Sequence, residues 1–117
     1  MHEVSIANSI IQIIKDVLPE DSKGYVSGVN IKVGRLSAID TEALLFAFDI
    51  VKAKTPLKKA VLNIEIIEGS GECSTCGEIF LMEGYATPCP KCGSYLVKIL
   101  QGKEMKIVSY DIENETN

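Results

Sequence analysis

Apolar and polar positions in the first half of the chain follow two different periods in turn. Residues 4–18 place apolar side chains three and four positions apart, which predicts an amphipathic helix. Residues 29–33 alternate between apolar and polar, as a strand with one buried face does. Asp40 is a favourable N-cap for a second predicted helix, which ends before Pro56. The pattern of residues 60–68 predicts a second strand. Two helices and two strands are therefore expected before the first cysteine.

The pattern changes at residues 69–71, Gly-Ser-Gly, which we interpret as a flexible joint. Residues 72–94 contain few aliphatic side chains, so this segment cannot bury enough apolar area to fold without an added constraint. Apolar positions return in residues 95–100 and 105–112, which predict a hairpin that turns around Gly102. We expect this hairpin to rejoin the first part of the chain, so that the intervening segment is an insertion.

The cysteines lie in that segment as two C-x2-C pairs separated by twelve residues: Cys73, Cys76, Cys89 and Cys92. Each pair can form a tight knuckle that offers two thiolates, and one tetrahedral zinc ion would join both knuckles. Gly77 and Gly93 follow the knuckles, where the backbone must turn sharply and an N–H group can approach sulfur. Two disulfides and a rubredoxin-like iron site are the alternatives. Because four thiolates leave zinc no open position, the site is predicted to be structural.

The chain as a whole is expected to have an α+β fold. With 46% hydrophobic and 24% charged residues, its composition is that of a globular protein. Residues 1–69 and 95–117 are predicted to form one domain, in which two helices pack on a small mixed β-sheet. Residues 70–94 are predicted to form an inserted, zinc-ribbon-like domain.

Charge and hydropathy disfavour two classes of protein, those that bind nucleic acids and those that span a membrane. The net charge is −4 and no Lys/Arg cluster exceeds the pair Lys58-Lys59, so a nucleic-acid partner is not expected. No stretch approaches the roughly 18 to 20 unbroken apolar residues of a membrane span, and the start of the chain lacks the basic region of a signal peptide. We therefore expect a cytoplasmic protein, in which paired thiols hold metal more often than they form disulfides.

A second candidate site lies at the start of the chain, where the single histidine is residue 2. The amine of Met1, the amide nitrogen and imidazole of His2 and the amide nitrogen of Glu3 could surround one ion in a plane. An α-amine has a reference pKa of about 7.7 to 8.0, so it gives up its proton readily when a metal competes. Planar nitrogen coordination suits Ni(II) or Cu(II). The alternative is a solvated or helix-capping histidine without a metal.

These segments resemble the HypA family of hydrogenase nickel-incorporation proteins over nearly the whole chain. The similarity runs in order through MHEVSIANSI, VNIKVGRLSAIDTEALLFAFDIV, TPLKKAVLNIEII, CSTCG and CPKCGS. The resemblance implies a nickel-binding α/β domain with an inserted zinc domain. It also implies a nickel metallochaperone that carries Ni(II) as transient cargo. Together with a partner nickel GTPase, such a protein delivers nickel to the [NiFe]-hydrogenase large subunit precursor, and some relatives also serve urease.

Position by position, Met1, His2 and Glu3 match the nickel motif of that family. Its zinc ligands match the four cysteines: Cys73, Cys76, Cys89 and Cys92. Some archaeal relatives carry a longer loop between the cysteine pairs, with additional histidines, and this chain has none there. Any further nickel ligand must therefore come from another group, and the nickel site is expected to be weaker or to be formed by the amino terminus alone.

Two other function classes agree less well with the sequence. A zinc-ribbon nucleic-acid-binding or adaptor protein is the main alternative, but the acidic charge and the few aromatic residues disfavour nucleic-acid binding. An enzyme is not expected, because there is one histidine, the thiols are committed and no cofactor motif is visible.

The sequence also contains no G-x-x-x-x-G-K-[ST] stretch, so GTP hydrolysis must come from the partner. The GTPase is expected to dock on the polar face of the first helix, although a plain solvated face would look the same. This face consists of Asn8, Gln12, Lys15 and Asp16.

Overall fold

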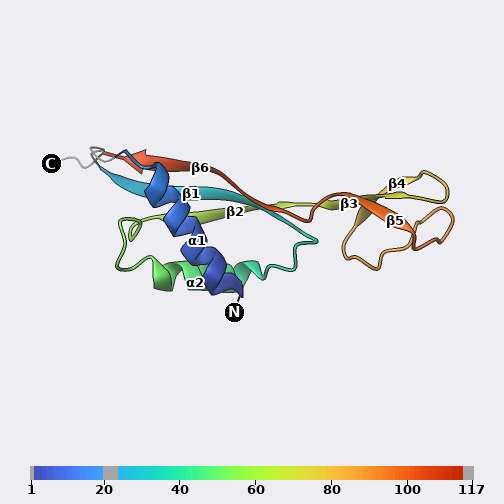
Figure 1. The fold of residues 1–117 in the computed structure, drawn as a ribbon, viewed down its shortest axis with the longest axis horizontal. Helices are drawn as coiled ribbons and strands as arrows, with labels where there is room; N and C mark the ends of the chain where they lie inside the picture. Colours follow the sequence, from blue (N-terminus) through green and yellow to red (C-terminus); the bar gives the residue numbers. More distant parts are fainter. Residues whose placement is uncertain (1, 20–23, 115–117) are drawn as a thin grey trace. The chain divides into compact units, whose positions relative to one another are not determined.

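The computed structural model describes residues 2–19 and 24–114, and these form two helices and six strands (Figure 1). In chain order the elements are α1 (His2–Val17), β1 (Tyr25–Gly34), α2 (Thr41–Val51), β2 (Val61–Ile67), β3 (Gly69–Cys73), β4 (Ile79–Met82), β5 (Val97–Gln101) and β6 (Met105–Glu113). The strands form two three-stranded sheets, in the orders β2-β1-β6 and β4-β3-β5. The predicted α+β fold, with two helices and small sheets, is confirmed.

The described residues divide into two compact units. The first comprises the described parts of Met1–Ile31, Ile39–Ile64 and Ile107–Asn117, and the second comprises Lys32–Ala38 and Glu65–Lys106. Both helices belong to the first unit, and β3, β4, β5 and the cysteines belong to the second. The unit that contains the cysteines thus extends beyond the predicted insertion, and the boundaries of separately folding domains stay a prediction.

The core of the first unit lies between the two helices and the strands that they cover. Both helices lie on the same side of the strands (Figure 1). The buried residues from α1 are Ala7, Ile10, Ile11 and Ile14. Helix α1 packs against α2. A second buried set comes from α2 and β1 and consists of Leu44, Ala47, Phe48, Val26, Val29 and Ile31. Each large side chain among them contributes roughly 1.5 to 3 kcal/mol through its removal from water.

The predicted start of the second helix is confirmed. Asp40 has an extended backbone and its Oδ1 atom accepts a hydrogen bond from the Ala43 N–H at 3.1 Å. This bond satisfies one of the first N–H groups of α2, which have no acceptor within the helix.

The prediction of a flexible joint at residues 69–71 is wrong. These residues form most of β3, the central strand of the second sheet, which pairs antiparallel with both β4 and β5. A Cβ atom on Gly71 would lie 2.5 Å from both the Met82 Sδ and the Val97 Cγ1. Glycine is therefore needed here because neighbouring side chains pack directly against the backbone.

The predicted hairpin between residues 95–100 and 105–112 is also wrong, although both segments are strands. β5 pairs with β3, with Val97 opposite Cys73, whereas β6 lies beside β1 in the other sheet. Between them, Gly102 has a φ of +105°, and a Cβ atom there would lie 2.6 Å from the Cα atom of Gly69. The glycine thus allows two backbone segments to cross at close range.

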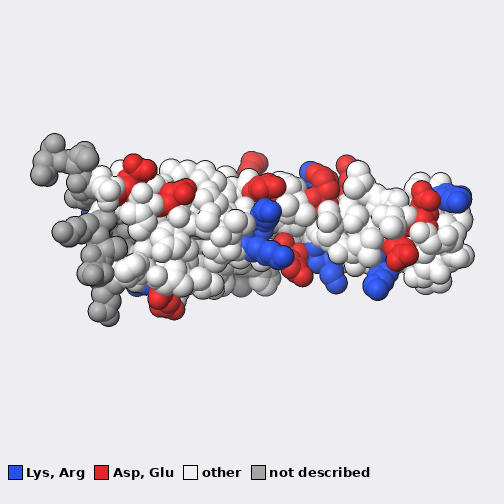
Figure 2. All heavy atoms as spheres, turned by 90° about the horizontal axis from the view of Figure 1, so that it is seen from above, with Lys and Arg blue, Asp and Glu red and all other residues white. Residues whose placement is uncertain are grey.

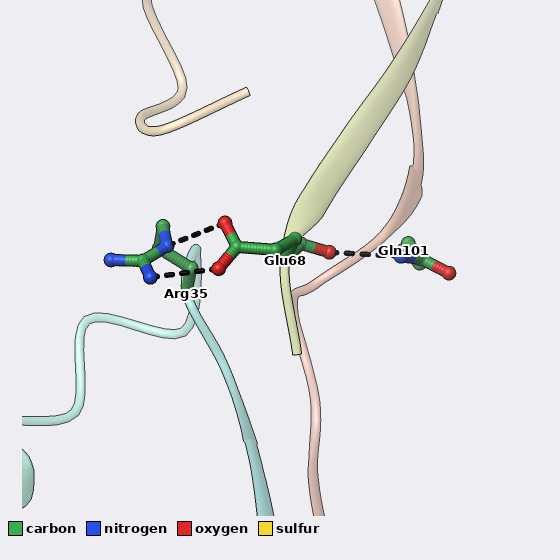
Figure 3. A network of polar contacts seen from close by, with 3 residues as sticks. All are labelled: Arg35, Glu68 and Gln101. Carbon is green, nitrogen blue, oxygen red and sulfur yellow. Dashed lines mark hydrogen bonds and ion pairs between the residues drawn. The ribbon is translucent and has the colours of Figure 1, made fainter. Parts of the chain in front are cut away.

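A polar cluster ties three segments of the second unit together (Figure 3). The Nε and Nη2 atoms of Arg35 donate to the two carboxylate oxygens of Glu68, each at 2.8 Å, and the Gln101 side-chain amide donates to the Glu68 backbone carbonyl at 3.0 Å. The hydrogen bonds from Arg35 lower the pKa of the Glu68 carboxyl. The pair therefore stabilises the fold above the unfolded-state pKa of this carboxyl, and that contribution disappears as the pH falls through its folded-state pKa. Because both side chains are exposed, the contribution is small.

Of the helices that the structure describes, neither has the length and apolar character needed to cross a membrane.

The packing at β3 predicts a difference between two glycine-to-alanine substitutions. Gly71→Ala should destabilise the metal-loaded protein by about 1 to 3 kcal/mol, because the added methyl group overlaps Met82 and Val97. Gly84→Ala is the matched control, since no atom lies within 4 Å of the new Cβ atom. Urea unfolding midpoints measure both effects, and equal midpoints for the two variants would contradict the packing account.

Candidate metal centres

The structure brings the four cysteine side chains together at one end of the second sheet. Their Sγ atoms all lie within 4.8 Å of one another, and the separations from Cys73 to Cys92 and from Cys76 to Cys89 are both 3.6 Å. A disulfide requires about 2.05 Å, and all four residues are free thiols in the structure. Around a tetrahedral zinc ion with bonds of about 2.3 Å, sulfur atoms lie roughly 3.8 Å apart. The cluster therefore has the dimensions of a tetrahedral thiolate site.

The two knuckles share the same local geometry. In the first, the Cys76 N–H points to the Cys73 Sγ at 3.4 Å. In the second, the N–H groups of Lys91 and Cys92 point to the Cys89 Sγ at 3.4 and 3.5 Å. Such N–H groups stabilise negative charge on sulfur, so each knuckle is prepared to hold a thiolate.

The glycines after the knuckles have one of their two predicted roles, the sharp backbone turn, and not the approach of an N–H group to sulfur. Gly77 and Gly93 have φ values of +82° and +78°, which side chains with a Cβ atom rarely adopt. Their N–H groups donate to the carbonyls of Cys73 and Cys89, at 2.9 and 2.8 Å, and not to sulfur. The surroundings of both Cβ positions are open. The turn itself, and not an approach to sulfur, therefore requires glycine.

Backbone hydrogen bonds from neighbouring segments position each knuckle. Cys73, at the end of β3, donates to the Glu78 carbonyl, and Cys89 donates to the Ser94 carbonyl, both at 2.8 Å. The Thr75 hydroxyl bonds to the Ser94 hydroxyl at 3.1 Å and so links the two knuckles. These supporting residues could not be predicted from the sequence, because their contacts depend on where the folded chain places each segment.

The four thiols differ in acidity. Hydrogen bonding from the Cys76 N–H lowers the pKa of Cys73 to about 6. The Glu78 N–H lowers the pKa of Cys76, but desolvation and the neighbouring sulfurs outweigh it and raise that pKa to about 12. Desolvation raises the pKa of Cys89, but the N–H groups of Cys92 and Lys91 shift it downward overall. The downward pKa shifts thus fall on Cys73 and Cys89, the two buried cysteines of the cluster.

The candidate nitrogen site begins at the first residue of α1. His2 is exposed and lies in the first turn, where helix N–H groups have no acceptor within the helix. The Glu3 carboxylate accepts the Asp40 N–H at 3.2 Å, and this bond lowers the pKa of Glu3. The Glu3 side chain is thus engaged by the start of α2. Met1, the third predicted participant, lies outside the described residues.

The two candidate centres belong to different compact units, His2 and Glu3 to the first and the cysteines to the second. The predicted donor sets differ as well, because one would consist of nitrogen and the other of sulfur.

A family model described as hydrogenase/urease nickel incorporation, metallochaperone, hypA matches residues 1–112. The chain belongs to the HypA family. HypA proteins of this description are metallochaperones, so the chain is a maturation factor for nickel proteins and not an enzyme. Its partners are accordingly components of hydrogenase maturation.

Similar proteins share this assignment across the whole chain. The hydrogenase maturation factor HypA of Parabacteroides distasonis is 41% identical over 115 residues, which cover 98% of this chain and all of the relative. The HypA factor of Prosthecochloris aestuarii is 38% identical over 113 residues, which cover 97% of this chain and all of the relative. The solution structure of the Ni metallochaperone HypA from Helicobacter pylori has a TM-score of 0.65 at 27% identity and covers 97% of this chain and 98% of its own.

Removing the metal from the cysteine site should unfold the second unit and leave the first folded. The second unit of this chain buries few apolar residues, so its folding depends on the metal. The first unit is stabilised by the packing of α1 against α2. Acid should act in the same direction, because protons compete with the metal for the thiolates. Amide NMR spectra before and after chelation test this, and retention of dispersed β3 and β5 signals in the metal-free protein would contradict it.

Proposed function

We propose that this HypA-family protein binds Ni(II) at its amino terminus and passes it to the precursor of a [NiFe]-hydrogenase large subunit, together with a partner nickel GTPase. The observation that carries the proposal is the exposed imidazole of His2 in the first turn of α1. An exposed site at a chain end can be approached by a receiving protein. A moderate affinity also suits cargo that must be released.

The proposed nickel site uses backbone nitrogen as well as the imidazole. The Met1 amine, the His2 amide nitrogen and imidazole, and the Glu3 amide nitrogen would occupy the four positions of a planar Ni(II) ion. The first turn of a helix supports this role, because its N–H groups are not committed to the helix and can release protons to a competing metal. The contact between the Glu3 carboxylate and Asp40 supports a backbone role for Glu3.

The proposed metal of the cysteine site is zinc, held by Cys73, Cys76, Cys89 and Cys92. Four thiolates in tetrahedral proximity suit this ion, which has no preference for planar geometry. A complete sulfur shell leaves no position for a substrate, so zinc would supply folding free energy to the second unit. Paired cysteines that hold metal are typical of a reducing compartment, and we propose a cytoplasmic location.

The alternative, a zinc-ribbon nucleic-acid-binding or adaptor protein, receives no support from the visible charge distribution. Figure 2 shows acidic and basic side chains interspersed on one face, without a continuous basic surface. Phosphate binding normally requires basic residues concentrated along one track.

Nickel titration of untagged, zinc-loaded protein tests the proposed site. His2→Ala and a one-residue extension before Met1 should each weaken Ni(II) binding by more than tenfold, or about 1.4 kcal/mol, because each removes or displaces a donor. Both variants should keep one zinc per chain.

Glu3→Ala is the matched control, because it removes the side chain and keeps the amide nitrogen. It should retain most of the nickel affinity. Equal affinity of all four proteins, or loss in the control alone, would overturn the proposed donor set.

A further inference from the structure

An apolar groove lies between the two helices of the first unit. It has a volume of about 260 Å³, and Val4 of α1 lines it together with a stripe from α2. The stripe consists of Ala43, Phe46, Ala47 and Ile50, which share one helical face. Phe46 is 69% exposed and Ile50 is 59% exposed, although both are large apolar side chains. Exposed apolar residues gathered in a hollow are typical of a protein interface.

The rim of this groove is acidic. Glu3 lines the groove directly. Glu42 and Asp49 lie four positions before and three positions after Phe46 on α2, so their side chains are neighbours of the exposed ring. Lys52 pairs with Asp49 at 3.0 Å, and the described residues show no ion pair for Glu42. A partner that enters the groove therefore meets negative charge at its edge.

We propose that this groove is the apolar centre of the surface on which the nickel GTPase docks. The occupant is an amphipathic segment of that partner, with a large apolar side chain in the groove and Lys or Arg residues facing the acidic rim. A second copy of this chain is a poorer occupant, because it would bring two acidic rims together and like charges repel. The inference rests on the proposed function, since it concerns the partner that exchanges nickel.

The groove lies beside the proposed nickel site. Glu3 is both a lining residue and the sequence neighbour of His2, and its carboxylate bonds to the backbone of Asp40 at the start of α2. A partner seated in the groove would hold its own metal ligands near residues 2 and 3. Nickel could then pass by exchange of ligands over a short distance.

The groove also adjoins the predicted polar docking face of α1. Val4, Asn8 and Lys15 are spaced by four and seven positions, so they lie along one side of the helix. The apolar groove and this polar strip would form the centre and the rim of one interface, which is the usual arrangement of protein interfaces.

Affinity for the purified nickel GTPase of the same maturation system tests the apolar centre. Phe46→Ala should weaken binding by about tenfold or more, mainly through faster dissociation, because it removes the exposed anchor. Ile50→Ala should weaken binding in the same direction. Val61→Ala is the matched control, since Val61 is 58% exposed in the same unit but lies outside the groove. It should leave the affinity unchanged.

Association rates test the acidic rim. Glu42→Lys should slow association with the GTPase and reduce its dependence on salt, because it removes attraction to the basic segment. Glu65→Lys, an equal charge reversal on an exposed residue of β2, is the control and should have a smaller effect.

Two results would overturn the proposal. One is equal loss of affinity in the groove variants and their controls. The other is unchanged GTPase affinity in Phe46→Ala. If the same variant also loses a homodimer in sedimentation, a second copy of the chain is the occupant. Nickel titration of the same variants separates this inference from the proposed function. Retained Ni(II) affinity with lost GTPase binding supports the groove, whereas a wild-type protein without an amino-terminal nickel site refutes the function alone.

Discussion

The proximity of four sulfur atoms is the arrangement on which the second compact unit depends. Its buried hydrophobic residues in the described chain are few: Val33, Leu36, Cys73, Met82 and Cys89. Two of these are themselves cysteines of the cluster, and a core of this size does not offset the entropy of ordering the chain. A metal ion that joins both knuckles supplies the missing free energy. The N–H groups aimed at sulfur and the left-handed glycines hold the knuckles in the geometry that the ion needs.

The two proposed donor sets would allow one small protein to hold one metal and to carry another. Thiolates in a closed tetrahedral shell retain their ion, while exposed nitrogen donors in a plane favour Ni(II) and release it when they are protonated. The proposed nitrogen donors at the start of α1 would lie beside an apolar groove with an acidic rim. Cargo binding and partner docking are thus proposed for one end of the first unit.

Local features were the part of the fold that could be predicted from the sequence. The period of apolar residues located both helices, Asp40 identified the start of α2, and the spacing of the cysteines predicted the cluster. Strand partners could not be predicted, because the pairing of β5 with β3 and of β6 with β1 is decided between segments distant in sequence. The role of Gly71 was predicted wrongly for a related reason. A glycine can mark either a flexible backbone or a place where other atoms pack closely against the backbone. Only the folded positions of Met82 and Val97 show that the second applies here. The groove was not predicted, because Phe46 and Ile50 follow the same helical period as core residues and the sequence does not show which apolar residues stay exposed.

The central claim is that nickel and the structural metal occupy separate sites with different donors. X-ray absorption at the nickel and zinc edges of protein loaded with one equivalent of each ion tests it most directly. The account predicts only nitrogen or oxygen neighbours around nickel, in a planar arrangement, and four sulfur neighbours around zinc. Sulfur in the first coordination shell of nickel would contradict the separation of the two sites.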